Sequence, residues 1–179
     1  MDGILETVVG YCGGRTIDPS YHRIGDHMEG IQVRYDPLVL SYDQLLEIFW
    51  SEHDYSRQPL SRQYMNAVFV HNQKQKEAVL QSMGKLPGKV ETEVNEFAGF
   101  YRAEDYHQKF YLQRYPEVKR DFLDIYPDFR EFTSSTAAAR VNGFLGGYGS
   151  RSDLEKIIPD LGLSTGTIEL LRSKTRNRR

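Results

Sequence analysis

The residues with the strongest chemical potential gather near the N-terminus, in the stretch Gly10–Gly30 (GYCGGRTIDPSYHRIGDHMEG). This stretch holds Cys12, the only cysteine of the chain, together with Tyr21, His27 and Glu29. A thiol, an imidazole and a carboxylate in one short segment have the types of a nucleophile, a base and an orienting acid. The same segment also has the composition of a strand end, a loop rich in Gly and Pro, and the start of a second strand. The sequence therefore leaves open whether Cys12 lies in a reactive site or in an ordinary turn.

The first hundred residues alternate between strand and helix patterns that would position these side chains. Strands are indicated by β-branched and aromatic residues or by alternating polarity, and helices by apolar residues with a period near 3.6. The pattern predicts strands at 6–11, 30–35, 66–71 and 89–95, and helices at 41–54 and 73–86.

The first predicted helix has a clear start signal. Ser41 can accept a hydrogen bond from the first helical turn, and Gln44, three residues later, completes a capping-box pattern. We expect Leu45, Ile48 and Phe49 to share one face of this helix, with Leu46 and Trp50 beside them.

The second half of the chain is mostly helical in pattern. In the first of its segments, residues 103–115, we expect Tyr106 and Phe110 to point inward. Strands with helical crossovers, followed by helices and loops, indicate a single α+β or α/β domain. The predicted helices lie at 103–115, 118–126, 135–147, 153–162 and 167–173.

Size and composition limit the class of protein. The chain has 179 residues and a formal net charge of −2, which suits one globular domain with its own core. A single cysteine excludes an internal disulfide and a Cys-rich metal site, and favours a cytoplasmic or organelle-matrix location over secretion. The sequence has neither a signal-peptide pattern nor an apolar run of the roughly 20 residues that a membrane span needs. We expect no membrane or nucleic-acid partner, although the basic end at 172–179 leaves a weak anion contact open beside a solvated tail.

Three ordered motifs resemble the A-type peptide methionine sulfoxide reductases. The motifs are the run from Val9 to Asp54 (VGYCGG…DPSYHRIGDHMEGIQVRYDPLVLSYDQLLEIFWSEHD), residues 61–76 (SRQYMNAVFVHNQKQK) and residues 100–116 (FYRAEDYHQKFYLQRYP). The resemblance covers residues 4–115, and residues 135–149 (STAAARVNGFLGGYG) resemble the C-terminal end of one subset of that family.

The resemblance implies reduction of the S epimer of methionine sulfoxide, free or in peptides and proteins, to methionine. A thiolate attacks the sulfoxide sulfur, a carboxylic acid kept protonated by apolar surroundings protonates the oxygen, and Tyr hydroxyls hold that oxygen. By motif, Glu29 in DHMEG corresponds to the acid, and Tyr21 in DPSY and Tyr64 in SRQYM to the tyrosines. The cysteine sulfenic acid that results is cleared by an external thiol such as thioredoxin or glutaredoxin, and no bound cofactor is implied.

The same resemblance implies a two-layer ferredoxin-like sandwich over residues 1–149, with a helical C-terminal extension and basic tail at 150–179. The family's first strand, which ends in Gly-Cys-Phe-Trp, and the helix that this cysteine opens have no counterpart ahead of Met1. We expect either an incomplete version of a longer product or a degenerate relative. Residues 53–61 (HDYSRQPLS) also replace a longer loop whose Asp the family uses, so that role is assigned to no residue.

Cys12 keeps two interpretations after this resemblance. Parallel strands of a βαβ unit end on one side of a sheet, which would put Cys12 near the pocket rim as a surrogate thiol. It lies in a Gly-flanked turn rather than at a helix start, so we expect its pKa near the free value of ~8.5. The alternative is an incidental small residue in a loop.

Three other functions remain as alternatives. An inactive form, or a non-catalytic module that binds methionine sulfoxide peptides, would keep Tyr21, Glu29 and Tyr64 without the nucleophile. A stacking platform for nucleic acid would use aromatic residues whose helical spacing indicates core positions instead: Tyr101, Tyr106, Phe110 and Tyr111. A metal site would use residues that match no conventional zinc spacing: His27, Glu29, His53, Asp54, Glu104 and His107.

Overall fold

The computed structural model describes residues 2–175, which fall into two compact units. The sheet unit comprises residues 2–4 and 9–104, and the helical unit comprises residues 5–8 together with the chain from Asp105 onward. The domain boundary predicted between residues 149 and 150 lies inside the helical unit. It therefore remains a prediction of where the helical extension begins. Within residues 2–175 every helix is too short or too polar to cross a lipid bilayer. The last four residues of the predicted basic tail lie outside the described part.

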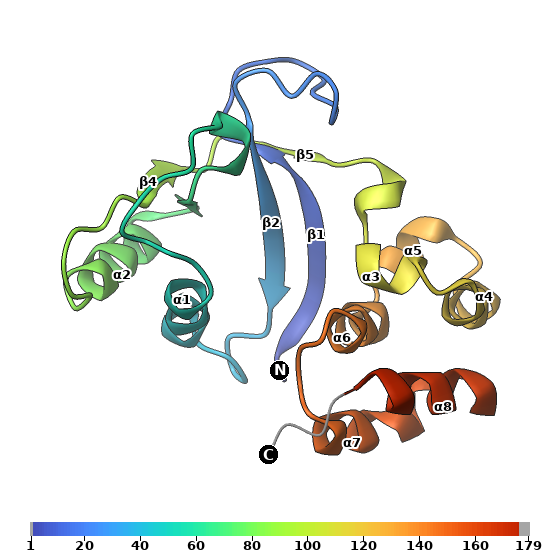
Figure 1. Ribbon diagram of the computed structural model, residues 1–179. Coiled ribbons are helices and arrows are strands. Elements are labelled where there is room, and N and C mark those ends of the chain that lie inside the picture. The colour runs from blue at the N-terminus through green and yellow to red at the C-terminus, as the bar shows by residue number, and fades with distance from the viewer. Residues whose placement is uncertain (1, 176–179) are drawn as a thin grey trace. The chain divides into compact units, whose positions relative to one another are not determined.

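Three strands form the main sheet, in the order β2-β1-β5 (Figure 1). They are β1 (Ile4–Cys12), β2 (Met28–Tyr35) and β5 (Phe100–Arg102), and β5 runs antiparallel to β1. The loop between β1 and β2 extends beyond the sheet at the top of Figure 1. The first two predicted strands are confirmed, whereas the sequence did not predict β5, because three residues are too few to show an alternating pattern.

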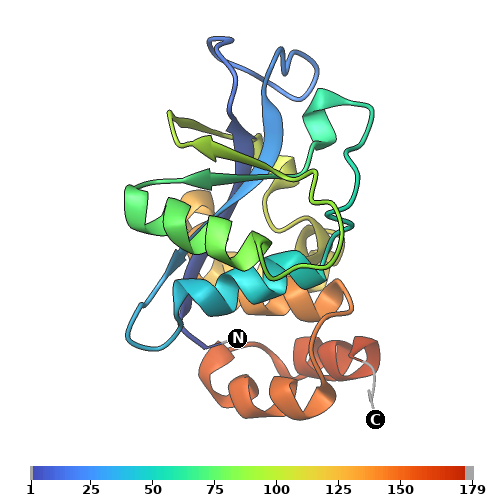
Figure 2. The ribbon, with the colours of Figure 1, turned by 90° about the vertical axis from the view of Figure 1, so that its left-hand side faces the viewer.

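A second pair of strands is parallel, formed by β3 (Ala67–Val70) and β4 (Glu93–Glu96). β3 agrees with its predicted range, and β4 occupies only the last part of the predicted strand and one residue beyond it. Helices α1 (Tyr42–Ser51) and α2 (Gln73–Met83) lie side by side in Figure 2.

The start of α1 has the predicted capping box. The Gln44 backbone N–H donates to the Ser41 hydroxyl over 3.2 Å, and the Ser41 N–H donates to the Gln44 side-chain oxygen over 2.9 Å. Two of the four backbone donors that a helix start leaves unpaired are commonly satisfied in this way, which fixes where the helix begins.

The buried side of α1 is formed by part of the predicted set. Leu46 and Trp50 are buried against α2 and the strand pair and Phe49 packs beside them, while Ile48 is exposed and Leu45 is half-buried. The Trp50 indole N–H donates to the Ser82 hydroxyl of α2 over 2.9 Å. A buried indole needs such a partner.

The helical unit is built around an apolar core. Each of the six α-helices in the described part of this unit contributes a fully buried side chain: Leu112, Phe122, Phe132, Val141, Leu154 and Leu171. The helices are α3 (Phe110–Gln113), α4 (Pro116–Ile125), α5 (Phe129–Ser134), α6 (Thr136–Leu145), α7 (Arg151–Leu161) and α8 (Thr165–Lys174). Helices α4, α6, α7 and α8 agree in place with predicted helices, whereas α5 was not predicted.

The continuous helix predicted for residues 103–115 is wrong. The chain forms a 3₁₀ turn, η2 (Asp105–His107), and then α3, with Lys109 in the left-handed region at φ 48° between them. The Lys109 ammonium is buried and donates to the Thr7 carbonyl oxygen over 2.6 Å and to the Thr7 hydroxyl over 3.1 Å. This contact across 102 residues stabilises a conformation that local sequence disfavours.

The break at Lys109 also changes which aromatic side chains are buried. Tyr106, Phe110 and Tyr111 are exposed, as is Tyr101 in the sheet unit, so the expectation of core positions is wrong for all four. Leu112 is the large apolar side chain of this segment that is fully buried.

Candidate active site

The loop between β1 and β2 is closed at its base by Asp26. Its carboxylate accepts hydrogen bonds from the backbone N–H groups of Arg15 (2.9 Å) and Thr16 (3.0 Å) and from the Thr16 hydroxyl (2.8 Å). These donors hold the pKa of Asp26 well below its usual range, and the backbone N–H groups contribute most to this lowering. A Cβ on Gly14 would lie 2.6 Å from an Asp26 oxygen, so the absence of a side chain there lets the two ends of the loop meet.

The buried side chain of His27 also stabilises this loop through hydrogen bonds to its backbone. It is buried, its Nδ1 accepts from the Gly14 backbone N–H over 3.1 Å, and its Nε2 donates to the Thr16 carbonyl oxygen over 2.8 Å. The donor and acceptor roles follow from these two partners and define a neutral imidazole with its proton on Nε2. Both ring nitrogens are thus occupied, which leaves neither available for a metal ion in this conformation.

Tyr21 lies at the tip of a tight turn within this loop. The Arg23 N–H donates to the Ser20 carbonyl oxygen over 2.9 Å and closes the turn. The backbone N–H of Tyr21 itself donates to the carboxylate of Glu104 over 2.9 Å. The backbone of Tyr21 is therefore held in place while its side chain remains exposed.

Glu29 and Tyr64 approach each other from different elements. Glu29 lies on β2, and Tyr64 ends the 3₁₀ turn η1 (Arg62–Tyr64). The Gln63 side-chain amide donates to the Glu29 carboxylate over 2.5 Å. A side-chain hydrogen bond with Tyr21, and then the charges of Tyr21 and Glu29, raise the pKa of the Tyr64 hydroxyl. The structure thus brings Tyr21, Glu29 and Tyr64 together.

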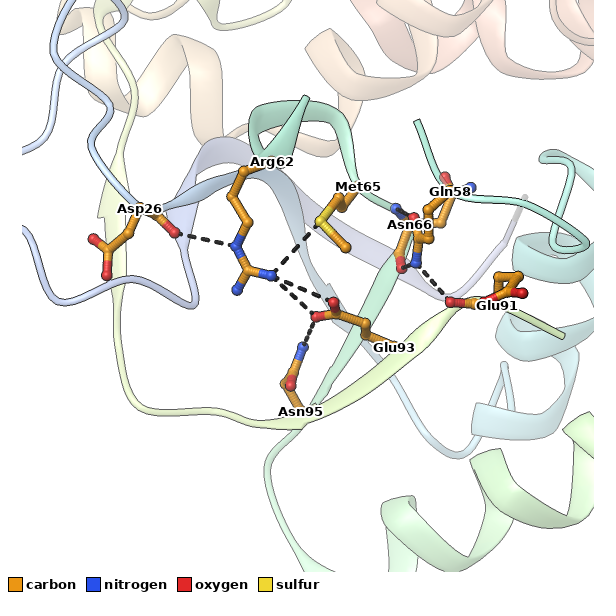
Figure 3. A network of polar contacts seen from close by, with 8 residues as sticks. All are labelled: Asp26, Gln58, Arg62, Met65, Asn66, Glu91, Glu93 and Asn95. Carbon is orange, nitrogen blue, oxygen red and sulfur yellow. Dashed lines mark hydrogen bonds and ion pairs between the residues drawn. The ribbon is translucent and has the colours of Figure 1, made fainter. Parts of the chain in front are cut away.

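A polar network around Arg62 holds η1 in place (Figure 3). The Arg62 guanidinium donates to the Glu93 carboxylate of β4 at 3.3 Å and, more weakly, to the Asp26 backbone carbonyl at 3.4 Å. Asn95 donates to the other Glu93 oxygen over 3.0 Å and orients it. Arg62 therefore links the element that carries Tyr64 to the loop that carries Tyr21.

Gln58 anchors the segment that leads into η1. Its side-chain amide donates to the carbonyl oxygens of Asn66 (2.8 Å) and Glu91 (2.7 Å), and its oxygen accepts from the Asn66 N–H over 2.7 Å (Figure 3). Three bonds from one side chain tie this segment to the residues that precede β3 and β4.

The surroundings of Glu29 differ from those that the family resemblance implies. Glu29 is exposed and contacts a polar amide, whereas the resemblance implies an acid in apolar surroundings. Sequence reasoning also missed Gln63, although its place beside Tyr64 was a usable signal. Glu104 was considered only as a metal ligand.

Cys12 is buried, with 3% of its surface exposed. Its Sγ lies 4.0 Å from the Met28 carbonyl oxygen. A Cβ added to Gly30 would lie 2.9 Å from the same Sγ atom. Burial raises the pKa of the thiol to about 11, so the expectation of a value near the free one is wrong. At pH 7 a thiol with that pKa is ionised in only about one molecule in ten thousand. Because the thiolate is the attacking form, the site as it stands disfavours Cys12 as a nucleophile.

The side chains considered as metal ligands have other partners. His53 contacts the Phe49 carbonyl oxygen (2.6 Å) and the Thr92 hydroxyl (3.0 Å), and Glu104 accepts from the Tyr11 hydroxyl (2.6 Å). Across residues 2–175, no group of three or more His, Cys, Asp or Glu side chains is placed to hold a metal ion.

Comparison with known proteins gives the same family over most of the chain. Residues 1–140 match the family model described as peptide methionine sulfoxide reductase, and residues 128–174 match the one described as selenoprotein methionine sulfoxide reductase A, helical domain. The chain is 34% identical over 168 residues to a peptide methionine sulfoxide reductase of Drosophila melanogaster, across 90% of this chain and 67% of that protein. It is 33% identical to peptide methionine sulfoxide reductase A5 of Arabidopsis thaliana, across 80% of this chain and 60% of that protein.

A solved structure agrees with this result. Mxr1 from Saccharomyces cerevisiae in reduced form superposes with a TM-score of 0.55 at 28% identity, over 64% of this chain and 74% of that one. The chain thus spans about two-thirds of the length of these relatives, with a mixed α+β fold like theirs. On the match over residues 1–140, the chain belongs to the peptide methionine sulfoxide reductase family.

Proposed function

We propose that this chain serves the reduction of methionine S-sulfoxide to methionine, and that Tyr21, Glu29 and Tyr64 receive the sulfoxide oxygen. The observation that carries the proposal is the position of η1 beside Glu29: the Gln63 amide, next to Tyr64, donates to the Glu29 carboxylate over 2.5 Å. The Tyr21 side chain, and to a smaller extent the charge of Glu29, raise the pKa of the Tyr64 hydroxyl. Two hydroxyl groups and one acid at a single point can hold an S=O oxygen and protonate it as it leaves.

The proposed reaction has two steps. A cysteine thiolate attacks the sulfoxide sulfur, the S–O bond breaks, and the oxygen leaves on the attacking sulfur as a sulfenic acid with the proton from Glu29. The substrate sulfur is thereby reduced by two electrons and the cysteine sulfur is oxidised by two. Two thiol groups of an external reductant, such as thioredoxin or glutaredoxin, then return the sulfenic acid to a thiol and release water and a disulfide.

Cys12 is the candidate nucleophile of this site. Cys12 is the thiol that the sequence offers, and its burial requires the end of β1 to open before the thiol can react. The same burial favours a second candidate function, a module that binds methionine sulfoxide peptides through Tyr21, Glu29 and Tyr64 without turnover.

The finer features of the fold are part of the proposal as well. We assign the sheet unit to a two-layer ferredoxin-like sandwich, which the packing of α1 and α2 with the strand pair in one apolar cluster supports. The substrates that fit are free methionine sulfoxide and peptides or proteins that contain it, and the reaction as written uses no metal ion.

A reductase assay with dithiothreitol and a methionine-S-sulfoxide peptide tests the proposal. If Glu29 is the proton donor, Glu29→Gln lowers turnover by about 100-fold or more. Full turnover in Glu29→Gln contradicts this role. Loss of turnover in Cys12→Ser identifies Cys12 as the nucleophile, and binding of the peptide without turnover in the unmodified chain supports the binding module.

A further inference from the structure

We propose that Glu104 is a positioning residue: its carboxylate fixes the turn that carries Tyr21 and so directs the Tyr21 hydroxyl to Tyr64. This inference rests on the proposed function for its meaning in catalysis, because it concerns one of the proposed sulfoxide-binding tyrosines.

Both carboxylate oxygens of Glu104 accept hydrogen bonds from residues far away in the chain. Oε1 accepts from the backbone N–H of Tyr21 over 2.9 Å, 83 residues away, and Oε2 accepts from the hydroxyl of Tyr11 over 2.6 Å, 93 residues away. A carboxylate that bridges two such donors ties a loop residue to a strand residue. Hydrogen bonds to a charged acceptor are also shorter and stronger than neutral ones.

The Glu104 end of this bridge is firmly supported. Tyr11 lies on β1 with 1% of its surface exposed, and β5 pairs with β1 immediately before Glu104. The pairing continues one residue past β5, where the Ala103 N–H donates to the Val9 carbonyl oxygen over 3.0 Å. Glu104 therefore extends from the end of the sheet, and the bridge ties the turn at Tyr21 to it.

Both donors of the bridge point at carboxylate oxygen atoms, and an ionised carboxyl group offers acceptors only. A glutamine at this position could keep both contacts, because its oxygen can accept from the Tyr21 N–H while its NH₂ group donates to the Tyr11 hydroxyl oxygen. Glu104→Met instead removes both acceptor oxygens with little change in side-chain volume, and it is the variant that tests the bridge.

The pKa of Tyr64 can be used to measure whether the Tyr21 hydroxyl is held in position. The hydrogen bond of Tyr64 with Tyr21 is the main cause of this raised pKa, and Glu29 is the second side chain that contributes. If the turn loosens, this bond weakens, and the Tyr64 pKa falls toward the ordinary tyrosine value of about 10.

The test is an NMR titration of the full chain with ¹³C-labelled tyrosine. In the unmodified protein the Tyr64 pKa lies above about 10, and in Glu104→Met it returns toward that value. Tyr11→Phe is the matched control: it removes the donor to Oε2 and leaves the Glu104 carboxylate in place, so the Tyr64 pKa stays near that of the unmodified protein. Tyr21→Phe removes the partner hydroxyl and sets the full size of the effect. A folded Glu104→Met protein with an unchanged Tyr64 pKa overturns the inference.

A second measurement needs no variant, in case Glu104→Met fails to fold. Hydrogen exchange of the unmodified protein should show the Tyr21 amide protected, although Tyr21 lies in an exposed turn. Rapid exchange of that amide in the folded protein overturns the inference.

The consequence for the site is measured separately. Affinity for N-acetylmethionine S-sulfoxide should fall by about tenfold in Glu104→Met, as expected for losing a charge-assisted bond that orders one ligand-binding side chain. If the unmodified chain does not bind this probe, the proposed function fails, while the Tyr64 titration and the Tyr21 amide still decide whether Glu104 holds the turn.

Discussion

The site-bearing loop of the sheet unit and the core of the helical unit are stabilised by opposite means. The loop relies on charged and polar side chains, chiefly Asp26, His27 and Glu104, which bind backbone N–H and C=O groups. The helical core relies on apolar side chains such as Phe122 and Phe132, which are fully buried with ring centroids 5.6 Å apart. Apolar burial gives stability without direction, whereas hydrogen bonds fix positions.

The comparison explains how the tyrosines of the site can be exposed and still be oriented. Tyr21 and Tyr64 are open to a ligand, because the groups that position them act on backbone atoms or on neighbouring residues. A site held in this way can present hydroxyl groups without burying them. Such a site should be sensitive to single polar substitutions that hardly affect global stability.

The largest expected effect is on the helical core. Phe122→Ala should lower the free energy of unfolding by about 3–5 kcal/mol, because it leaves a cavity among fully buried side chains. Urea denaturation followed by circular dichroism measures this loss. Ile125→Ala, an exposed position on the same helix, is the control and should cost less than about 1 kcal/mol. Equal losses in the two variants would remove the contrast between core and surface.

A smaller and more local effect is expected at Asp26. Asp26→Asn replaces an acceptor-only carboxylate by a group with one acceptor oxygen, so the amides of Arg15 and Thr16 should exchange with solvent several-fold faster. Hydrogen exchange by NMR measures this change. The stability at 25 °C should change much less than in Phe122→Ala.

The pH dependence of this loop follows from the lowered pKa of Asp26. Because the folded-state pKa lies below the unfolded value of about 3.9, the stabilisation is fully present above that value. It is lost only as the pH falls through the folded-state pKa. Protection of the Thr16 amide should therefore persist at pH 4 in the unmodified protein, and Asp26→Asn should show no such acid transition. Loss of protection near pH 5 would contradict the proposed bonding.

The parts of the fold that depend on neighbouring residues could be predicted from the sequence. Ser41 and Gln44 define the start of α1 through contacts within one helical turn, and that prediction is confirmed. The conformation of Lys109 depends on Thr7, which is 102 residues away, so no local pattern indicated the break before α3. The buried indole of α1 likewise pairs with Ser82 of another helix.

The candidate site shows the same difference between features that local sequence indicates and features that depend on distant residues. Motifs identified Tyr21, Glu29 and Tyr64 as candidates, and the structure brings them together, but their roles stay predictions until they are tested. No motif indicated that Glu104 accepts from the Tyr21 backbone, because that contact depends on the pairing of β5 with β1. The burial of Cys12 beside Gly30 depends on the pairing of two strands and was equally hidden.

The central claim is that Tyr21 and Tyr64, beside Glu29, form a receptor for a sulfoxide oxygen. Titration of the ¹³C-tyrosine-labelled chain with the separate S and R epimers of N-acetylmethionine sulfoxide tests it most directly. The account predicts that the S epimer shifts the Tyr21 and Tyr64 signals, and that Tyr64→Phe weakens this binding by about tenfold. Signals of both tyrosines that stay unchanged at saturating S epimer would contradict it.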